Sequence, residues 1–381
     1  MNSLYLSCFH NRYPLIDVLN QLAQLPINAQ VLEASPHEVG FSLRVQCDEQ
    51  GDAQALQTSL LALWPDMSVQ VQAGTPGPCT FVAVLMAPVL QAKHLAQLVE
   101  AAATQGLSLL GARSLAARAE DRQAWQLRFA GEADLVQARA VVRALADRLR
   151  VDINLTPRNV FGRQGGLICF DMDSTLIKAE CIDELAAAAG IGEQVSAITA
   201  AAMRGELDFR ESFSRRMALL NGLPESELSK IAERIELMDG AKTLVNTLKA
   251  RGFHTAILSG GFVYFAEKIQ ARLGIDEIHA NALEIVDGKV TGRVTGTVVD
   301  GQRKAELIQQ IAKARGVALA QVIAVGDGAN DLPMLSLAGM GVAIHAKPLV
   351  RASADFAIST LGLESLCYLL GMEDDDLIRE P

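Results

Sequence analysis

The sequence lacks paired cysteines and long apolar runs. Its six cysteines are scattered without a CxxC spacing, so neither a zinc site nor a redox-active pair is expected, and a reducing compartment is favoured. No apolar run approaches the roughly 20 residues that cross a bilayer. The first residues, MNSLYLSCFHNRYP, lack the basic start and apolar core of a secretory signal. We therefore expect a soluble, cytoplasmic protein without a membrane partner.

Basic residues are also in deficit, since 34 Lys and Arg face 44 Asp and Glu for a formal net charge of −10. Phosphate backbones select basic surfaces, so nucleic acid is not an expected partner. A small anionic substrate stays compatible with this charge, because a site can be locally positive on an acidic protein. Nucleotide binding is not indicated either: GxxxxGK[ST] is absent, and LSGGFVYF does not fit GxGxxG.

The 381 residues exceed one compact core and predict several domains. Two stretches, 1–75 and 79–157, each show the order β-α-β-β-α-β, with AGTPGP as the linker between them. This order resembles tandem ACT domains, which sense amino acids in many metabolic enzymes. The strand-to-helix turns FHNRYP and MAPVLQ lack the glycine at which such modules dock their ligand. Binding of serine or another amino acid and a purely structural or dimerising role both stay open.

Residues 165–381 have a different pattern, in which short apolar strands such as LICF, HTAIL, VIAVG and GVAI alternate with helical stretches. This pattern predicts an α/β fold, a Rossmann-like parallel sheet with helices on both faces. The region at about 181–238 is helical nearly throughout and is predicted to form a helical cap inserted after the first strand. A second insert at 283–300 is predicted to be a hairpin that turns at Asp287-Gly288.

The stretch GGLICFDMDSTL runs an apolar strand into Asp171 and Asp173. It begins like an EF-hand calcium loop, but Leu176 stands where that loop needs glycine, and Ile182 where it needs a bidentate glutamate. Helix capping would explain Asp173 and Ser174 but not an acid at the very end of a buried strand. Two carboxylates there imply a bound cation, a shared proton, or both.

Other predicted strands also end in polar groups, and these fall into a recognisable order. Ser259-Gly260-Gly261 follows HTAIL, DGAND follows VIAVG, and Lys304 begins a helical run between them. Carboxyl ends of parallel strands meet at one edge of a sheet, so we expect a single site. Over about residues 165–365 the chain resembles the haloacid dehalogenase superfamily, whose four motifs match Asp171-Met172-Asp173-Ser174-Thr175, Ser259, Lys304 and Gly326-Asp327 through Asp331.

The resemblance implies phosphoryl transfer through a covalent aspartyl-phosphate, which divides the hydrolysis of an inert ester into two steps. Asp171 is then the nucleophile, and Asp173 is the general acid and later the general base. One Mg²⁺ per active site is expected, with Asp171, Asp327 and the backbone carbonyl of Asp173 as ligands. Lys304 supplies positive charge to the transferring group.

Four further residues have implied roles around the phosphate. The Ser259 hydroxyl and the Gly260 N–H are expected to bind its oxygens. Asn330 is expected at the substrate, and Asp331 is expected to orient the lysine and the metal's surroundings.

The predicted cap suggests which ester is bound. The stretches DMDSTLIKAECIDELA, MRGELDFRESFSRRMALL, LSGGF and AVGDGANDLPML closely resemble the phosphoserine phosphatases. In that family the residues that match Glu180 and Arg216 bind the amino-acid group, by pairing with its ammonium and carboxylate. Met203 and Phe209 match apolar residues that close the pocket, although their spacing alone also fits a helix core.

The resemblance therefore implies hydrolysis of O-phospho-L-serine to serine and phosphate, the last step of serine biosynthesis. We also expect a homodimer. Two alternatives stay open at this point. One is a related phosphatase or phosphotransferase with another small metabolite, for example with homoserine as acceptor. The other is an amino-acid sensor that carries an inactive phosphatase domain.

Overall fold

The computed structural model describes residues 4–9, 29–37, 40–47, 68–73, 78–116, 121–158, 165–204 and 206–379, with a few positions between 55 and 62. No helix among these residues has the length and apolar character needed to span a membrane. The chain divides into two compact units. Unit 1 comprises Met1–Gly162 and Cys367–Asp376, and unit 2 comprises Arg163–Leu366 and Leu377–Pro381.

The N-terminal half of unit 1 is described through four strands. β1 (Leu4–Phe9) pairs antiparallel with β4 (Ser68–Ala73), and β2 (Ala29–His37) pairs antiparallel with β3 (Gly40–Cys47). The two helices that the sequence predicts between these strands lie largely outside the described residues.

The second half of unit 1 is a four-stranded antiparallel sheet in the order β6-β7-β5-β8, with two helices. Its core joins Trp125 and Phe129 of the sheet to Leu95 and Val142 of the helices. This is the β-α-β-β-α-β order that the sequence predicts for 79–157. Its elements are β5 (Phe81–Ala87), α3 (Ala92–Ala103), β6 (Leu107–Ser114), β7 (Gln123–Gly131), α4 (Leu135–Leu149) and β8 (Asp152–Pro157).

A short segment near the C-terminus also belongs to unit 1. The fully buried Tyr368 accepts a hydrogen bond on its hydroxyl from Arg122 Nε at 2.9 Å and donates to Asp374 Oδ1 at 2.6 Å. The backbone N–H of Asp374 donates to the Leu115 carbonyl at 2.8 Å. A buried polar chain therefore fixes this segment to the second half of the unit.

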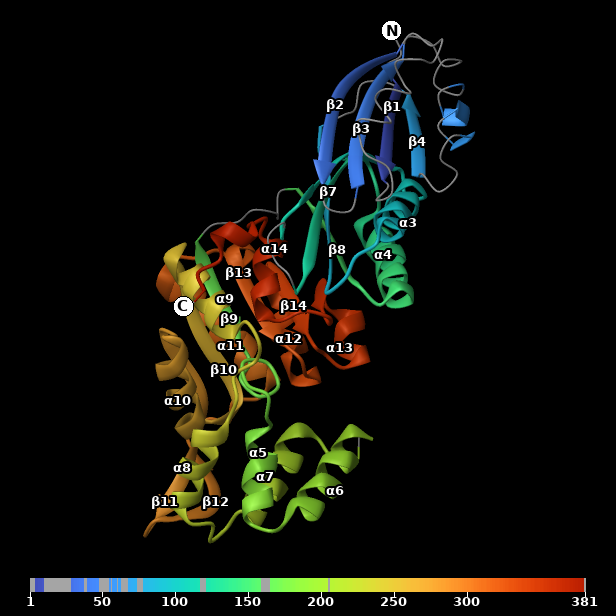
Figure 1. Ribbon diagram of the computed structural model, residues 1–381. Coiled ribbons are helices and arrows are strands. Elements are labelled where there is room, and N and C mark those ends of the chain that lie inside the picture. Colours follow the sequence, from blue (N-terminus) through green and yellow to red (C-terminus); the bar gives the residue numbers. More distant parts are fainter. Residues whose placement is uncertain are drawn as a thin grey trace. The chain divides into compact units, whose positions relative to one another are not determined.

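Unit 2 contains a seven-stranded sheet in the order β12-β11-β10-β9-β13-β14-β15 (Figure 1). All neighbouring strands run parallel except the edge strand β12, which is antiparallel to β11. This arrangement confirms the α/β fold with a Rossmann-like parallel sheet that the sequence predicts for residues 165–381. The strands are β9 (Gly166–Phe170), β10 (Phe253–Phe262), β11 (Glu277–Val286), β12 (Lys289–Thr295), β13 (Val322–Gly326), β14 (Met340–Ile344) and β15 (Phe356–Ile358).

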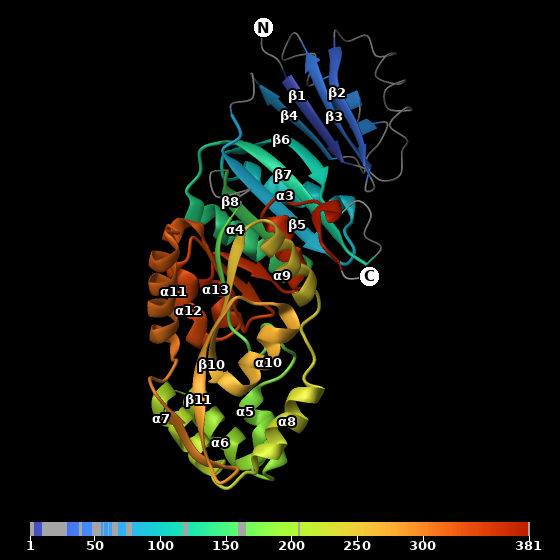
Figure 2. The same ribbon diagram turned by 90° about the vertical axis from the view of Figure 1, so that its left-hand side faces the viewer.

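Helices cover both faces of this sheet. Figure 2 shows α11 (Gly301–Arg315) and α12 (Leu332–Leu337) on one side, with α9 (Ala241–Ala250) and α10 (Val263–Leu273) on the other. Buried residues of α11 and α12 share one core cluster with β9, β10 and β13. Strands enclosed on two faces read as continuous apolar runs, as LICF does.

A helical insert follows β9, at the place where the sequence predicts a cap. Its helices are α5 (Cys181–Ala188), α6 (Gly192–Met203), α7 (Phe209–Leu219) and α8 (Glu225–Arg234). One segment connects β9 to the insert, and a second leads from the insert back to the sheet. Ile177 of the first segment forms a β-bridge with Asp173 of the same segment and another with Leu237 of the second.

The predicted hairpin is present, and it turns at Asp287-Gly288, where both residues have positive φ (51° and 70°). Its first strand, however, begins at Glu277 and not near residue 283. The longer strand arises because β11 first pairs parallel with β10 and then, from Ala282, pairs antiparallel with β12.

Candidate active site

The carboxyl ends of the central strands bring the predicted residues together. β9 lies between β10 and β13, so Asp171, which follows β9, faces the ends of both neighbours. Ser259 lies near the end of β10, and Asp327 directly follows β13. Asp171, Ser259 and Asp327 are all buried. The strand order alone therefore places them at one edge of the sheet.

Lys304 enters this edge from the first turn of α11. The Asp300 side chain accepts the Arg303 N–H at 2.8 Å and so starts the helix one turn before the lysine. The Lys304 ammonium is fully buried and lies 2.8 Å from Asp171 Oδ1 and 2.7 Å from Asp331 Oδ1. Burial alone would lower the pKa of Lys304, but the two carboxylates outweigh it and raise that pKa. Lys304 is thus a permanently charged group behind Asp171.

Asp331 organises the loop after β13. Its Oδ2 accepts the backbone N–H of Asp327 at 3.1 Å and that of Gly328 at 2.9 Å, while its Oδ1 accepts from Lys304. The neighbouring Asn330 lines the pocket and donates from Nδ2 to Asp331 Oδ1 at 3.4 Å. Both oxygens of Asp331 therefore already have donors from the protein.

Carboxylate oxygens of Asp171, Asp327 and Asp331 lie within 4.8 Å of one another. Burial and the charge of Asp331 raise the pKa of Asp171 well above its usual value. The same two causes raise the pKa of Asp327 to about 7. Lys304 neutralises only part of this cluster, and buried oxygen ligands of this kind suit a hard divalent cation. Because Asp331 is committed to other donors, Asp171 and Asp327 are the carboxylates that can hold a metal ion.

Asp173 is held where the cap begins. Its Oδ1 accepts the Cys181 N–H at 3.0 Å at the start of α5. Burial, followed by the negative charge of Glu180, raises the pKa of Asp173 to about 6. Gly261 leaves room for this carboxyl, since a Cβ there would lie 2.5 Å from Asp173 Oδ2. Asp173 is therefore close to the condition in which a carboxyl can both give and take a proton.

The SGG segment is fixed by its own hydrogen bonds and by Asn281. Ser259 Oγ accepts the Gly261 N–H at 2.8 Å. Asn281 donates from Nδ2 to the Gly260 carbonyl at 2.8 Å, and its Oδ1 accepts the Val299 N–H at 2.9 Å. Asn281 is not among the predicted residues, because a single asparagine inside a strand gives no signal in the sequence.

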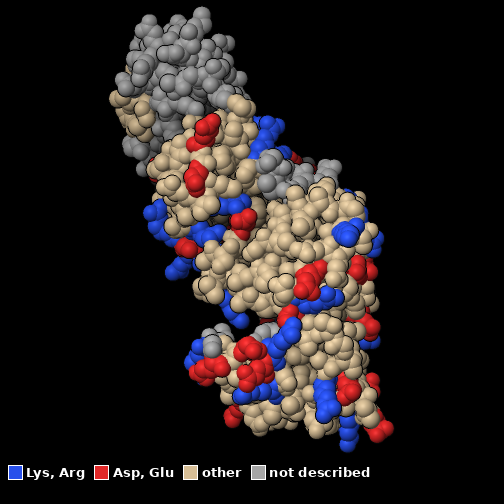
Figure 3. Space-filling model, turned by 180° about the vertical axis from the view of Figure 1, so that it is seen from behind, with Lys and Arg blue, Asp and Glu red and all other residues tan. Residues whose placement is uncertain are grey.

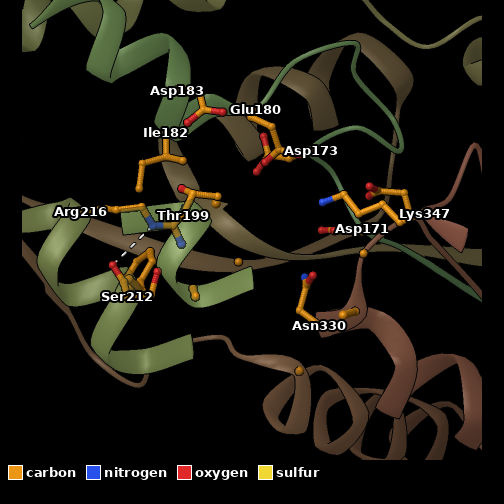
Figure 4. Close-up of a pocket in the computed structure, with 18 of the residues that line it drawn as sticks. Asp171, Asp173, Glu180, Ile182, Asp183, Thr199, Ser212, Arg216, Asn330 and Lys347 are labelled. Carbon is orange, nitrogen blue, oxygen red and sulfur yellow. Dashed lines mark hydrogen bonds between the residues drawn. The ribbon is translucent and has the colours of Figure 1, made fainter. Parts of the chain in front are cut away.

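A cavity of about 780 Å³ opens between the sheet edge and the cap, and Figure 3 shows the surface hollowed between these two lobes of unit 2. In Figure 4 the side chains of Glu180, Asp183 and Arg216 lie on the cap side of the cavity. Asp171 and Lys347 lie on the sheet side. Side chains that follow the strands of the sheet and side chains of the cap therefore line the same cavity.

The cap side combines acidic and basic groups. Ser174, with φ of 54°, donates from Oγ to Glu180 Oε1 at 2.7 Å. Burial lowers the pKa of Arg216, while the charges of Asp183 and Glu180 oppose this effect. Arg216 Nε donates to the Ser212 carbonyl at 3.4 Å, and its guanidinium has no carboxylate ion pair within the described part of the chain. It can therefore donate hydrogen bonds to the carboxylate of a ligand.

The predicted site residues and the residues that line the cavity do not coincide fully. The structure places Met203 at the end of α6 and Phe209 at the start of α7, but their side chains lie outside the described part. The cavity also includes Asp183, Ser212 and Lys347, which are absent from the predicted set. Of these three residues, only Lys347 could have been predicted from the sequence, because it follows the strand GVAI on the same edge of the sheet as the other site residues.

Comparison with known proteins agrees with this geometry. Residues 168–336 match the family model of the haloacid dehalogenase-like hydrolases. The phosphoserine phosphatase of Archaeoglobus fulgidus is 45% identical over 240 residues, which is 63% of this chain and 70% of that protein. The solved, unliganded probable phosphoserine phosphatase of Vibrio cholerae has a TM-score of 0.62 and 34% identity, covering 77% of this chain and 87% of that one.

A structure described as a phospho-aspartyl intermediate analogue of phosphoserine phosphatase is 43% identical, with a TM-score of 0.51. It covers 54% of this chain and 99% of that one. The N-terminal part of the sequence thus lies beyond what this shorter structure matches. The extent of the identity and its overlap with the site described above show that the chain belongs to the phosphoserine phosphatases, within the haloacid dehalogenase-like hydrolases.

Proposed function

We propose that this protein hydrolyses O-phospho-L-serine to L-serine and inorganic phosphate, as the last step of serine biosynthesis in the cytoplasm. One observation carries the proposal. A single cavity contains Asp171 and Asp173, which follow β9, together with Glu180 and Arg216 of the cap. The first pair suits transfer of a phosphoryl group, and the second pair suits the two charges of an α-amino acid.

Asp171 and Asp327, with the backbone carbonyl of Asp173, would hold one Mg²⁺, which when bound offsets negative charge on the carboxylates and the ester. An oxygen of Asp171 attacks phosphorus, and the bond from phosphorus to the serine oxygen breaks. Asp173 gives its proton to that leaving oxygen. Lys304 keeps a positive charge beside Asp171 throughout.

The second step regenerates the enzyme. Asp173, now a carboxylate, takes a proton from water as the water oxygen attacks phosphorus. The bond between phosphorus and Asp171 breaks, and inorganic phosphate leaves. The Ser259 hydroxyl and the Gly260 N–H would bind phosphate oxygens, with Asn330 at the substrate and Asp331 orienting Lys304.

The test is phosphate release from a panel of phosphomonoesters in the presence of Mg²⁺, with Asp171→Asn as the inactive control. We expect a strong preference for phosphoserine over esters that lack its ammonium or carboxylate. Including homoserine as an acceptor separates hydrolysis from phosphoryl transfer. A preferred ester without either charged group would contradict the substrate assignment.

Arg216 and its neighbour provide a matched pair of variants. Arg215 lies beside it on α7, is exposed and pairs with Glu211 at 2.6 Å. We expect Arg216→Ala to raise KM for phosphoserine by about 100-fold, as for loss of a charge-assisted pair worth roughly 3 kcal/mol, and to affect a simple alkyl phosphate little. Arg215→Ala should leave both values near wild type. Equal effects of Arg216→Ala on the two esters would remove it from the amino-acid site.

For the N-terminal region we propose two modules, 1–75 and 79–157, that precede the phosphatase domain at 165–381. These modules are proposed to support a homodimer and to bind an amino acid such as serine. The element order over 81–157 supports this part of the proposal. Sedimentation of the full chain tests the dimer. Calorimetry with serine, compared between wild type and Arg216→Ala, separates a second binding site from product binding in the cavity.

A further inference from the structure

Lys347 is a cationic side chain of the cavity that the mechanism above does not use. It follows β14 and directly precedes α13 (Pro348–Ser353). In Figure 4 its side chain extends from the sheet side into the cavity, with the nitrogen directed toward the region of Asp171 and Asp173. Lys347 is exposed, and it forms no ion pair with any residue that the structure describes. Its ammonium is available to a ligand.

The backbone at Lys347 is fixed, so its side chain starts from a defined point. The Lys347 N–H donates to the Asp327 carbonyl at 3.4 Å. The residue before Ala346, His345, has a φ of 44°, and Pro348 sets the first turn of α13. Burial and nearby carboxylates raise the pKa of Asp327, and the positive charge of Lys347 offsets part of that rise. Lys347 is therefore electrostatically coupled to the reacting end of the cavity.

Neither of the other two cations of the site can take the place of Lys347. Lys304 is fully buried between two carboxylates and does not line the cavity. Arg216 lies on the opposite, cap side. An incoming phosphate carries up to two negative charges into a cavity lined by several carboxylates. Among the described lining residues, Lys347 is the cation on the sheet side that can offset this repulsion.

We propose that Lys347 binds the phosphoryl group of the incoming ester and of the phosphate product, as a second lysine beside the buried Lys304. The proposal rests on the proposed function only in that the substrate is a phosphate monoester. It does not depend on which alcohol the ester contains. Contact with phosphate, and not with the amino-acid part, predicts the same effect for every ester.

The test compares Lys347→Met and Lys347→Arg with Lys313→Met, a matched change at an exposed lysine of α11 outside the cavity. We expect Lys347→Met to raise KM about tenfold, equivalent to about 1.4 kcal/mol, for both phosphoserine and a simple alkyl phosphate, with a smaller change in kcat. Calorimetric binding of inorganic phosphate in Mg²⁺ should weaken by a similar factor. Lys347→Arg should recover most of both losses, and Lys313→Met should change neither.

Three results would overturn the proposal. The first is unchanged phosphate binding in Lys347→Met, and the second is a KM effect confined to phosphoserine. The third is weaker Mg²⁺ binding in Lys347→Met, because removing a cation beside Asp327 should leave metal affinity equal or higher. If wild type does not prefer phosphoserine, the proposed function fails, yet weaker phosphate binding in Lys347→Met would still support the role of Lys347.

Discussion

Removing one charge from the acidic cluster should stabilise the metal-free protein. The pKa of Asp327 rises from 3.8 to about 7 in the folded state, because of burial and then the charge of Asp331. A carboxyl whose pKa is raised on folding binds its proton more tightly in the folded than in the unfolded state. Stability is therefore lost as pH rises from about 4 to about 7, at about 1.4 kcal/mol per pH unit, for a total of at most about 4 kcal/mol.

Asp327→Asn removes this charge with little change of shape. The amide oxygen can still accept the Thr175 hydroxyl, which donates to Asp327 Oδ1 at 3.3 Å. In EDTA at pH 7.5 we expect unit 2 of the variant to be more stable than wild type by up to about 4 kcal/mol, with a smaller difference at pH 5. Added Mg²⁺ should stabilise wild type and should have much less effect on the variant.

The assay must report on unit 2 alone. Both tryptophans, Trp64 and Trp125, belong to unit 1, so intrinsic tryptophan fluorescence would follow the wrong unit. Hydrogen exchange of peptides from β9 and β13, measured by mass spectrometry, gives the opening free energy of the central sheet. Glu267→Gln, at an exposed position on α10, is the control for loss of a negative charge.

Two outcomes would refute this reasoning. If Asp327→Asn were less stable than wild type in EDTA at pH 7.5, the carboxylate would not be destabilising in the metal-free protein. If the difference between the two proteins did not change between pH 5 and pH 7.5, it could not arise from the raised pKa of Asp327. A similar gain in Glu267→Gln would indicate a general effect of net charge.

Two further predictions concern Asp173. In Gly261→Ala the new Cβ would lie 2.5 Å from Asp173 Oδ2, so we expect the carboxyl to move. As for loss of general acid–base catalysis, kcat should then fall by at least about 100-fold. Retention of kcat within a few-fold would contradict this expectation, and thermal unfolding checks that the variant keeps its fold. In Glu180→Gln the negative charge that helps raise the pKa of Asp173 is lost. The decline of kcat/KM at rising pH should then begin at lower pH, measured with an alkyl phosphate so that recognition of the ammonium plays no part; a shift to higher pH would be inconsistent with Asp173 as the acid.

The sequence was sufficient to predict the parallel sheet and the groups that follow its central strands. Asp171, Ser259 and Asp327 could be found because each follows an apolar run, and parallel strands end at a common edge. Asn281 could not be found in this way, since its role comes from bonds to Gly260 and Val299 that depend on the tertiary structure.

Contacts that are distant in sequence were also beyond prediction. Arg122 and Tyr368 are 246 positions apart, and neither belongs to a pattern that indicates their buried hydrogen bond. For a related reason, the sequence predicts that the hairpin begins near residue 283, whereas β11 begins at Glu277. Alternation within the strand marks the part that pairs with β12, whereas the part that pairs with β10 depends on a neighbour some 20 residues away.

The arrangement of charge links stability to reactivity in unit 2. Asp171 and Asp327 are costly to bury as anions, and one lysine that is shared with Asp331 cannot compensate both. The same deficit of positive charge would favour a bound cation, and a cation there would offset the charge of Asp171, the proposed nucleophile, toward a negatively charged ester. The features that weaken the metal-free fold are therefore those on which the proposed phosphoryl transfer depends. A variant that relieves this repulsion, such as Asp327→Asn, should gain stability and lose activity for one and the same electrostatic reason.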